Sequence, residues 1–165
     1  MKNKIYLLLI FLIIIFGLLL RTVGLEQSPP SLGFDEAALG YNAYSLLKTG
    51  RDEYGNWLPL SLRSFNDFKP ALYSYLTIPF IYFWGLNATA VRMTSAVAGT
   101  ISLIFLYLLL IKYIKNKWLL VFIFAVLSVQ PYRLHFSRSA FETNLSAMFF
   151  YGGAYFLLTT KSRLK

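Results

Sequence analysis

The sequence contains no cysteine, only seven acidic residues and a single histidine among its 165 residues. The absence of cysteine excludes a disulfide framework and any cysteine-based nucleophile or metal site. Charged residues make up 14% of the chain and hydrophobic residues 57%, which is far more apolar than an ordinary soluble domain. The composition therefore indicates a membrane protein.

The few charges that are present are mainly positive, with a formal net charge of +9. No basic amphipathic run or RNA-binding motif accompanies this charge, so nucleic acid is not an expected partner. Eight Lys and Arg residues gather in three clusters without any acid: "MKNK" at 1–4, "KYIKNK" at 112–117 and "KSRLK" at 161–165. The positive-inside rule predicts that all three clusters lie on the cytoplasmic side of a cell membrane.

Four apolar segments are predicted to cross the membrane, at residues 5–20, 93–111, 118–132 and 143–160. With these four spans, the chain crosses the membrane twice between each basic cluster and the next. All three clusters therefore lie on the same side. The first segment is long enough to cross a hydrocarbon core of about 30 Å if its flanking side chains snorkel. We interpret it as an uncleaved anchor, because no small-residue cleavage site follows it; a signal peptide is the alternative.

A further apolar segment spans residues 70–91. It has no charged residue, and it contains two prolines and six aromatic residues. This composition suits a helix at the membrane interface, where amphipathic rings prefer to lie. If the segment does not cross, all seven acids fall on the outer side. The alternative is that it crosses, which moves the cluster at 112–117 outside, against the charge rule.

These segments predict an all-α integral membrane protein, with about four spanning helices in one transmembrane domain over 1–165. An external loop at 21–91 is predicted to contain juxtamembrane helices. Within this loop, the apolar spacing from Asp35 to Lys48 predicts a helix that stops at Gly50.

The two adjacent carboxylates Asp35 and Glu36 begin this predicted helix. One interpretation is capping, because acids in the first turn satisfy free backbone N–H groups and complement the helix dipole. The other is catalysis, because the same location keeps an aspartate ionised and able to act as a base. Position alone does not choose between them.

Two other polar groups belong to the predicted outer face. Arg138 and Glu142 would stand one turn apart on one face if residues 138–142 are helical, as a functional pair or as a simple surface ion pair. Lys69 enters the interfacial segment, either as an interface anchor or as a cation beside a lipid phosphate. His135 is interpreted as structural, and no metal ligand is predicted.

Five stretches in order resemble the N-terminal third of membrane glycosyltransferases of the GT-C class. They are "SPPSLGFDEAALGYNAYSLLKTGRDEYG", "FNDFKPALYSYLTIPFIYFWGLN", "AVRMTSAVAGTISLIFLYLL" and "FSRSAFETNLSAMFF", preceded by the N-terminal anchor. The most similar group is that of the dolichyl-phosphate-mannose protein mannosyltransferases and their bacterial relatives, including the aminoarabinose transferases.

The resemblance implies a role for each candidate site residue. Asp35 would be the catalytic acid of the first external loop, with Glu36 as its neighbour and Glu142 as a second acid. Three cations would lie near the phosphate of the donor: Lys69, Arg92 and Arg138.

The implied reaction moves a sugar from a polyprenyl-phosphate donor to a hydroxyl of a protein, lipid or glycan acceptor on the outer face of the membrane. One carboxylate would suffice as a base, because the phosphate is already a competent leaving group. Inversion at the anomeric carbon is expected. Whether a divalent cation takes part is left open by the resemblance.

The family's proteins are several hundred residues longer than this chain. The resemblance therefore predicts an N-terminal fragment that is inactive alone. The competing interpretation is a noncatalytic small membrane protein, such as an assembly factor or a piece of a transporter. Ionisable residues within the spans would favour transport, and the spans are nearly free of them.

Overall fold

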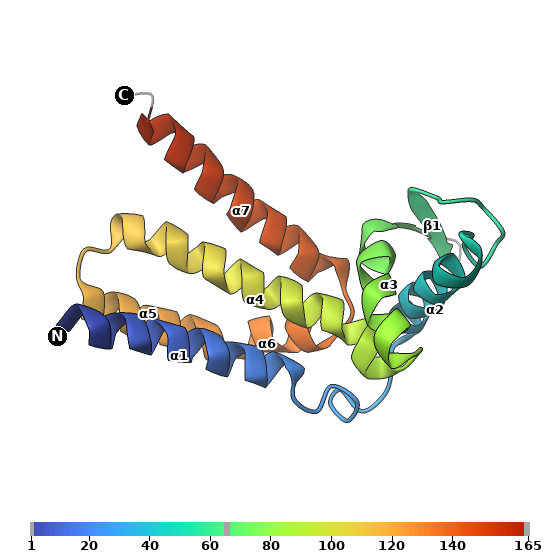
Figure 1. Ribbon diagram of the computed structural model, residues 1–165, viewed down its shortest axis with the longest axis horizontal. Coiled ribbons are helices and arrows are strands. Elements are labelled where there is room, and N and C mark those ends of the chain that lie inside the picture. The colour runs from blue at the N-terminus through green and yellow to red at the C-terminus, as the bar shows by residue number, and fades with distance from the viewer. Residues whose placement is uncertain (1, 65–66, 164–165) are drawn as a thin grey trace.

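The computed structural model describes residues 2–64 and 67–163, with side chains described for 4–64 and 67–160. Its elements are α1 (Lys2–Thr22), α2 (Phe34–Thr49), β1 (Ser61–Ser64), β2 (Asp67–Pro70), α3 (Leu72–Trp84), α4 (Ala88–Tyr113), α5 (Lys117–Val129), α6 (Pro131–Arg138) and α7 (Glu142–Arg163). Helices α1, α4 and α5 run along the long axis, and α7 diverges from α4 (Figure 1). The segments from α2 to α3 form one end of the molecule.

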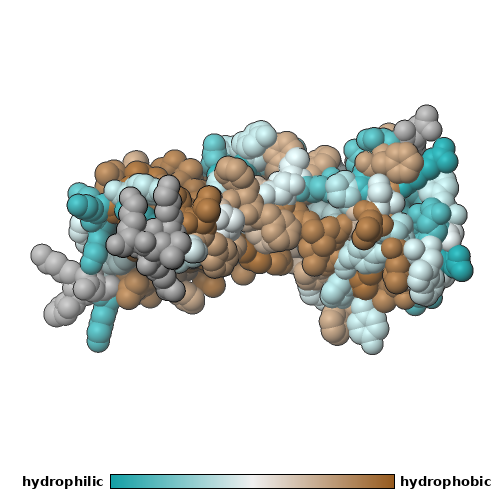
Figure 2. Space-filling view, turned by 90° about the horizontal axis from the view of Figure 1, so that it is seen from above, coloured by the Kyte–Doolittle hydropathy of each residue, from teal (hydrophilic) through white to brown (hydrophobic). Residues whose placement is uncertain are grey.

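The long helices pack around an apolar cluster of α1, α4 and α5. Its buried members are Tyr6, Ile10, Leu103, Leu120 and Phe124. The hydroxyls of Tyr6 and Tyr107 are 2.8 Å apart, so the only polar atoms of these two rings satisfy each other. Hydrophobic side chains predominate along the middle of the molecule, and hydrophilic ones gather at both ends (Figure 2).

Among the described residues, two helices are long and apolar enough to cross a membrane: α1 over Lys4–Thr22, and α4. A third crossing is possible only if α5 and α6 count together, and these two helices meet at an angle of 46°. The predicted span at 118–132 falls on this bent pair, because α5 ends at Val129 and Pro131 begins a new helix, and it stays a prediction. Proline lacks the N–H that would continue the α5 ladder. Helix α7 covers the predicted span at 143–160 without reaching the apolar character of α1 and α4, so four spans remain a prediction.

The start of α1, the connection between α4 and α5, and the end of α7 all lie at the same end of the molecule (Figure 1). The cluster at 112–117 belongs to this end. The side chains of residues 1–3 and 161–165 lie outside the described part. The arrangement agrees with the predicted placement of all three basic clusters on one side of a membrane.

Helix α3 lies across the opposite end of the bundle (Figure 1). It has 13 residues and ends at Trp84, and Gly85 follows with a positive φ of 76° before α4 begins at Ala88. Such a helix is about 20 Å long, less than the hydrocarbon thickness of about 30 Å. Its C-terminal rings Tyr82, Phe83 and Trp84 are exposed, as expected of an interfacial helix.

The described chain is mostly helical, as predicted, but the loop before α3 contains a two-stranded antiparallel sheet that the all-α prediction did not include. Strands β1 and β2 pair with Leu62 opposite Lys69. Leu62 is buried, whereas its neighbours Ser61 and Arg63 are exposed, which gives β1 two distinct faces. Each strand has only four residues, too few for the alternation to be recognised in the sequence.

Whether α3 crosses the membrane can be tested with single cysteines at the exposed positions Ser61 and Lys115, because the chain has no cysteine of its own. If α3 does not cross, only α4 separates these positions, and an impermeant thiol reagent added to intact cells should label Ser61→Cys but not Lys115→Cys. Both variants should react after permeabilisation. Labelling of both variants in intact cells would show that α3 crosses as well.

Candidate functional site

The first turn of α2 gives its two acids different surroundings. Gly33 precedes the helix in an extended conformation, and its N–H donates to Glu36 Oε2 at 2.9 Å. This contact is one half of a capping box, in which the third helical residue reaches back to the cap. Glu36 thus makes the capping contact, and Asp35 does not.

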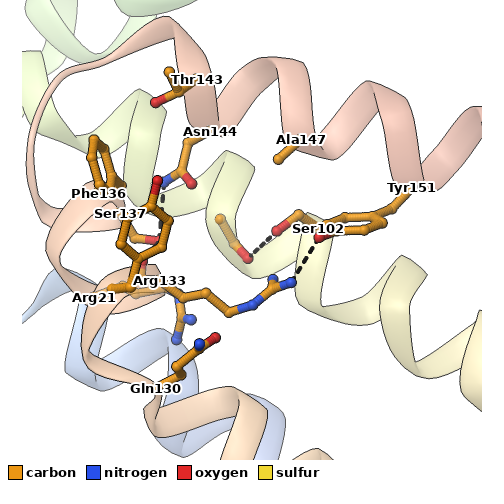
Figure 3. Close-up of a pocket in the computed structure, with 12 residues that line it drawn as sticks. Arg21, Ser102, Gln130, Arg133, Phe136, Ser137, Thr143, Asn144, Ala147 and Tyr151 are labelled. Atoms are coloured by element: carbon orange, nitrogen blue, oxygen red, sulfur yellow. Dashed lines mark hydrogen bonds between the residues drawn. The ribbon is translucent and has the colours of Figure 1, made fainter.

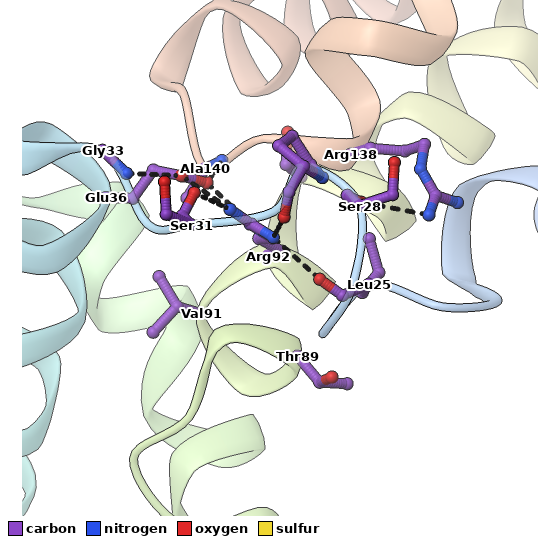
Figure 4. Close-up of polar contacts among 12 residues, drawn as sticks. Leu25, Ser28, Ser31, Gly33, Glu36, Thr89, Val91, Arg92, Arg138 and Ala140 are labelled. Atoms are coloured by element: carbon purple, nitrogen blue, oxygen red, sulfur yellow. Dashed lines mark hydrogen bonds and ion pairs between the residues drawn. The ribbon is translucent and has the colours of Figure 1, made fainter.

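Glu36 is 4% exposed and forms a two-pronged ion pair with Arg92 of α4. Arg92 donates from Nε to Oε1 at 2.9 Å and from Nη2 to Oε2 at 3.0 Å. The N–H of Ala140, in the connection between α6 and α7, donates to Oε1 at 2.7 Å. With the bond from Gly33, the carboxylate accepts four hydrogen bonds (Figure 4).

These contacts determine the charge state of Glu36. Burial raises the pKa of its carboxyl, but the hydrogen bonds from Arg92, Ala140 and Gly33 and the positive charge of Arg92 bring that pKa below its ordinary value. Glu36 is therefore ionised, yet every acceptor direction is taken. The four bonds give Glu36 a structural role, and its implied part in catalysis stays a prediction.

Arg92 is fully buried and uses all five N–H donors of its guanidinium. Two go to Glu36, and the other three go to the carbonyls of Leu25, Pro29 and Ser31 at 2.7–2.8 Å. Every donor of Arg92 is thus used within the protein in this structure, and its expected contact with a donor phosphate stays a prediction. It joins α4 to α2 and to the segment after α1 (Figure 4).

Arg138 holds the end of α1 instead of standing beside Glu142. Its Nη atoms donate to the carbonyls of Leu20, Val23, Gly24 and Ser28 at 2.6–3.1 Å. A cation at a helix C-terminus satisfies orphan carbonyls and complements the dipole. Residues 138–142 are not one helix, since α6 ends at Arg138, Ser139 is extended and α7 begins at Glu142, so the condition for pairing Arg138 with Glu142 is not met.

Glu142 lies in the first turn of α7, where its charge complements the helix dipole. Its Oε1 is buried without a hydrogen-bond partner. No ion pair to Glu142 occurs among the described side chains. Its implied role as a second acid stays a prediction.

Asp35 and Lys69 meet at the end of the molecule formed by α2 and the strands. They are 34 residues apart in sequence, and Lys69 Nζ forms an ion pair with Asp35 Oδ1. The Asp35 side chain is 55% exposed, whereas that of Lys69 is 13% exposed. The structure therefore brings together an accessible carboxylate and a cation held against the protein, two of the six predicted site residues.

A polar cavity of about 370 Å³ lies between the end of α1 and helices α4, α6 and α7 (Figure 3). Arg21 and Arg133 line it. Neither arginine is among the site residues predicted from the sequence. The position of Arg21 at the end of an apolar helix was the one available signal, and nothing in the sequence showed which helices would surround it.

Searches of protein-family models, of curated proteins and of solved structures give no match to this chain. Within the described residues, no group of three or more His, Asp or Glu side chains is placed to hold a metal ion. The geometry around Asp35 is therefore the basis of the functional argument.

The adjacent acids should differ sharply in their effect on stability. Glu36→Gln leaves Arg92 buried without a counter-charge, and breaking such a pair costs about 3–5 kcal/mol. Asp35→Asn removes a largely exposed pair, which contributes about 0–1 kcal/mol. Thermal unfolding in detergent, followed by circular dichroism, should show a large loss for the first variant and a small one for the second. Equal losses would contradict the assignment of Glu36 as the buried acid.

The lowered pKa of Glu36 also predicts a dependence of stability on pH. Since the carboxylate binds protons less readily in the folded state, its contribution is complete above the unfolded value of about 4.3 and is lost as pH falls through the lower folded pKa. Unfolding midpoints of the wild type and of Glu36→Gln should therefore converge as the pH is lowered from 7 to 3. A constant difference over this range would show that Glu36 is not the group that titrates.

Proposed function

We propose that this chain is part of a membrane glycosyltransferase that transfers a sugar from a polyprenyl-phosphate donor to an acceptor hydroxyl on the extracytoplasmic face of the membrane. The observation that supports this most directly is the ion pair between Asp35 and Lys69. The resemblance assigns the base to one of these residues and a contact with the donor phosphate to the other. Their contact provides both groups at one exposed place.

In the proposed reaction, Asp35 takes the proton of the acceptor hydroxyl as its oxygen bonds to the anomeric carbon of the sugar. The bond from that carbon to the phosphate oxygen breaks, and the phosphate leaves with the electron pair. Lys69 changes partner from Asp35 to the phosphate when the donor binds, which frees the carboxylate and stabilises the departing charge. Attack opposite the leaving group inverts the anomeric configuration.

The position of the pair supports a lipid-linked donor. It lies at the end of the bundle opposite the basic connection at 112–117, which the positive-inside rule places in the cytoplasm. Helix α3 follows β2 directly and exposes Tyr82, Phe83 and Trp84, residues suited to the interface. In the proposed arrangement, the phosphate of the donor is anchored in the outer leaflet and meets Lys69 there.

The catalytic role of Asp35 can be tested in the protein encoded by the complete reading frame. Asp35→Asn keeps the shape of the side chain and removes the base, so transfer from polyprenyl-phosphate sugars in membranes should fall by about 10²-fold or more. Protein amount should stay near that of the wild type, because Asp35 makes no capping contact.

Asp67→Asn is the matched control, since Asp67 is an exposed acid on the same strand as Lys69 and its side chain accepts from the neighbouring Phe68 N–H. It should transfer sugar at nearly the normal rate. An Asp35→Asn protein as active as Asp67→Asn would remove the base from the proposal, and the noncatalytic interpretation would then be preferred.

A further inference from the structure

The cavity between α1, α4, α6 and α7 is lined by twelve residues, none of which is Asp or Glu (Figure 3). Two are arginines, and several others offer neutral polar groups, among them Ser102, Gln130, Asn144 and Tyr151. Its volume of about 370 Å³ falls within the usual range for sites that hold small ligands. The lining is thus both polar and of one charge sign.

Arg21 is the deepest cation of the cavity, with 1% of the residue exposed. Its Nη1 donates to the carbonyls of Gly17 and Ser128 at 2.8 and 3.2 Å, and its Nε is buried without a partner. None of the described carboxylates lies within salt-bridge distance of Arg21. Carbonyl contacts satisfy donors but do not neutralise a buried charge, which normally requires an anion.

Arg133 adds a second positive charge from α6. Its Nη2 donates to Tyr151 Oη at 2.7 Å, and its guanidinium carbon is 5.3 Å from the centre of that ring. Tyr151 on α7 therefore holds Arg133 in place without supplying a counter-charge. Arginine is the side chain best suited to bind a phosphate by two parallel hydrogen bonds.

We propose that this cavity binds a phosphate group, which Arg21 and Arg133 hold between them. The inference is independent of the proposed sugar transfer, because neither Asp35 nor Lys69 lines the cavity. Arg21 is in the last turn of α1, at the end of an apolar helix where lipid headgroups lie. The phosphate is therefore that of a membrane lipid or that of a free phosphate compound, two sources of the same chemistry.

The test compares two phosphate probes on the purified chain in a neutral, phosphate-free detergent. Inorganic phosphate represents the free source, with sulfate at equal ionic strength as its control. Dihexanoyl phosphatidic acid represents the lipid source, with dihexanoyl phosphatidylcholine as the chain-matched control. Thermal unfolding is followed as each probe is titrated, because a ligand that binds the folded state raises the midpoint.

The wild-type midpoint should rise with at least one phosphate probe more than with its control. A response to both probes assigns a phosphate site open to free compounds, and a response to phosphatidic acid alone assigns a lipid headgroup. Arg21→Gln and Arg133→Gln should each require about tenfold or more probe for half of the rise, the scale of one lost charge-assisted hydrogen bond.

Arg51→Gln is the matched control, since it removes one positive charge from an exposed arginine outside the cavity. It should respond as the wild type does, which separates site binding from attraction to the net charge of +9. If Arg21→Gln does not fold, Arg133→Gln decides alone, because Arg133 is less buried. No rise in the wild type, or an unchanged response of Arg133→Gln, would overturn the proposal.

Discussion

The buried ion pair between Glu36 and Arg92 holds together the part of the molecule that carries the candidate site. A guanidinium in the interior is costly unless each donor has a partner and the charge has a counter-charge. Arg92 meets both conditions, with its partners drawn from α2 and from the backbone after α1. A lysine could not replace it, because an ammonium has three donors and no planar fork. The relative positions of α2, α4 and the connection between α6 and α7 follow from this one side chain and its carboxylate.

The same pair explains why Asp35 is accessible. Successive side chains on a helix point about 100° apart, so with Glu36 directed into the core its neighbour is turned away from Arg92. The irregular segment between α1 and α2 has carbonyls that no helix or strand satisfies, and such groups need partners when buried. Arg92 donates hydrogen bonds to three of these carbonyls. Arg138 donates to four carbonyls, which include one at the end of α1. The exposed carboxylate of Asp35 therefore follows a backbone segment that Arg92 and Arg138 hold in place.

Local features of the fold could be predicted from the sequence, whereas contacts between distant segments could not. The helix from Asp35 to Lys48 and its stop at Gly50, which has a φ of 69°, follow from apolar spacing and from the left-handed conformation that glycine permits. The bend at Pro131 was also visible in principle, because proline cannot continue a helix. By contrast, Arg92 lies 56 residues from Glu36, and no local pattern reports which cation a buried acid will meet. The resemblance therefore suggested six site residues with Asp35 as the catalytic acid, and only tertiary structure separates those used for folding from those left accessible.

The cations at this end of the molecule differ in how many of their donors are already used by contacts within the protein. Arg92 has no donor left, and Arg138 spends its Nη donors on backbone carbonyls. Lys69 has a carboxylate partner that is itself exposed, so an incoming phosphate can compete for it in solvent. Arg21 and Arg133 face a cavity whose described lining has no acid. Two places at this end of the molecule therefore combine a cation with room for an anion: Lys69 beside the exposed Asp35, and the cavity that Arg21 and Arg133 line.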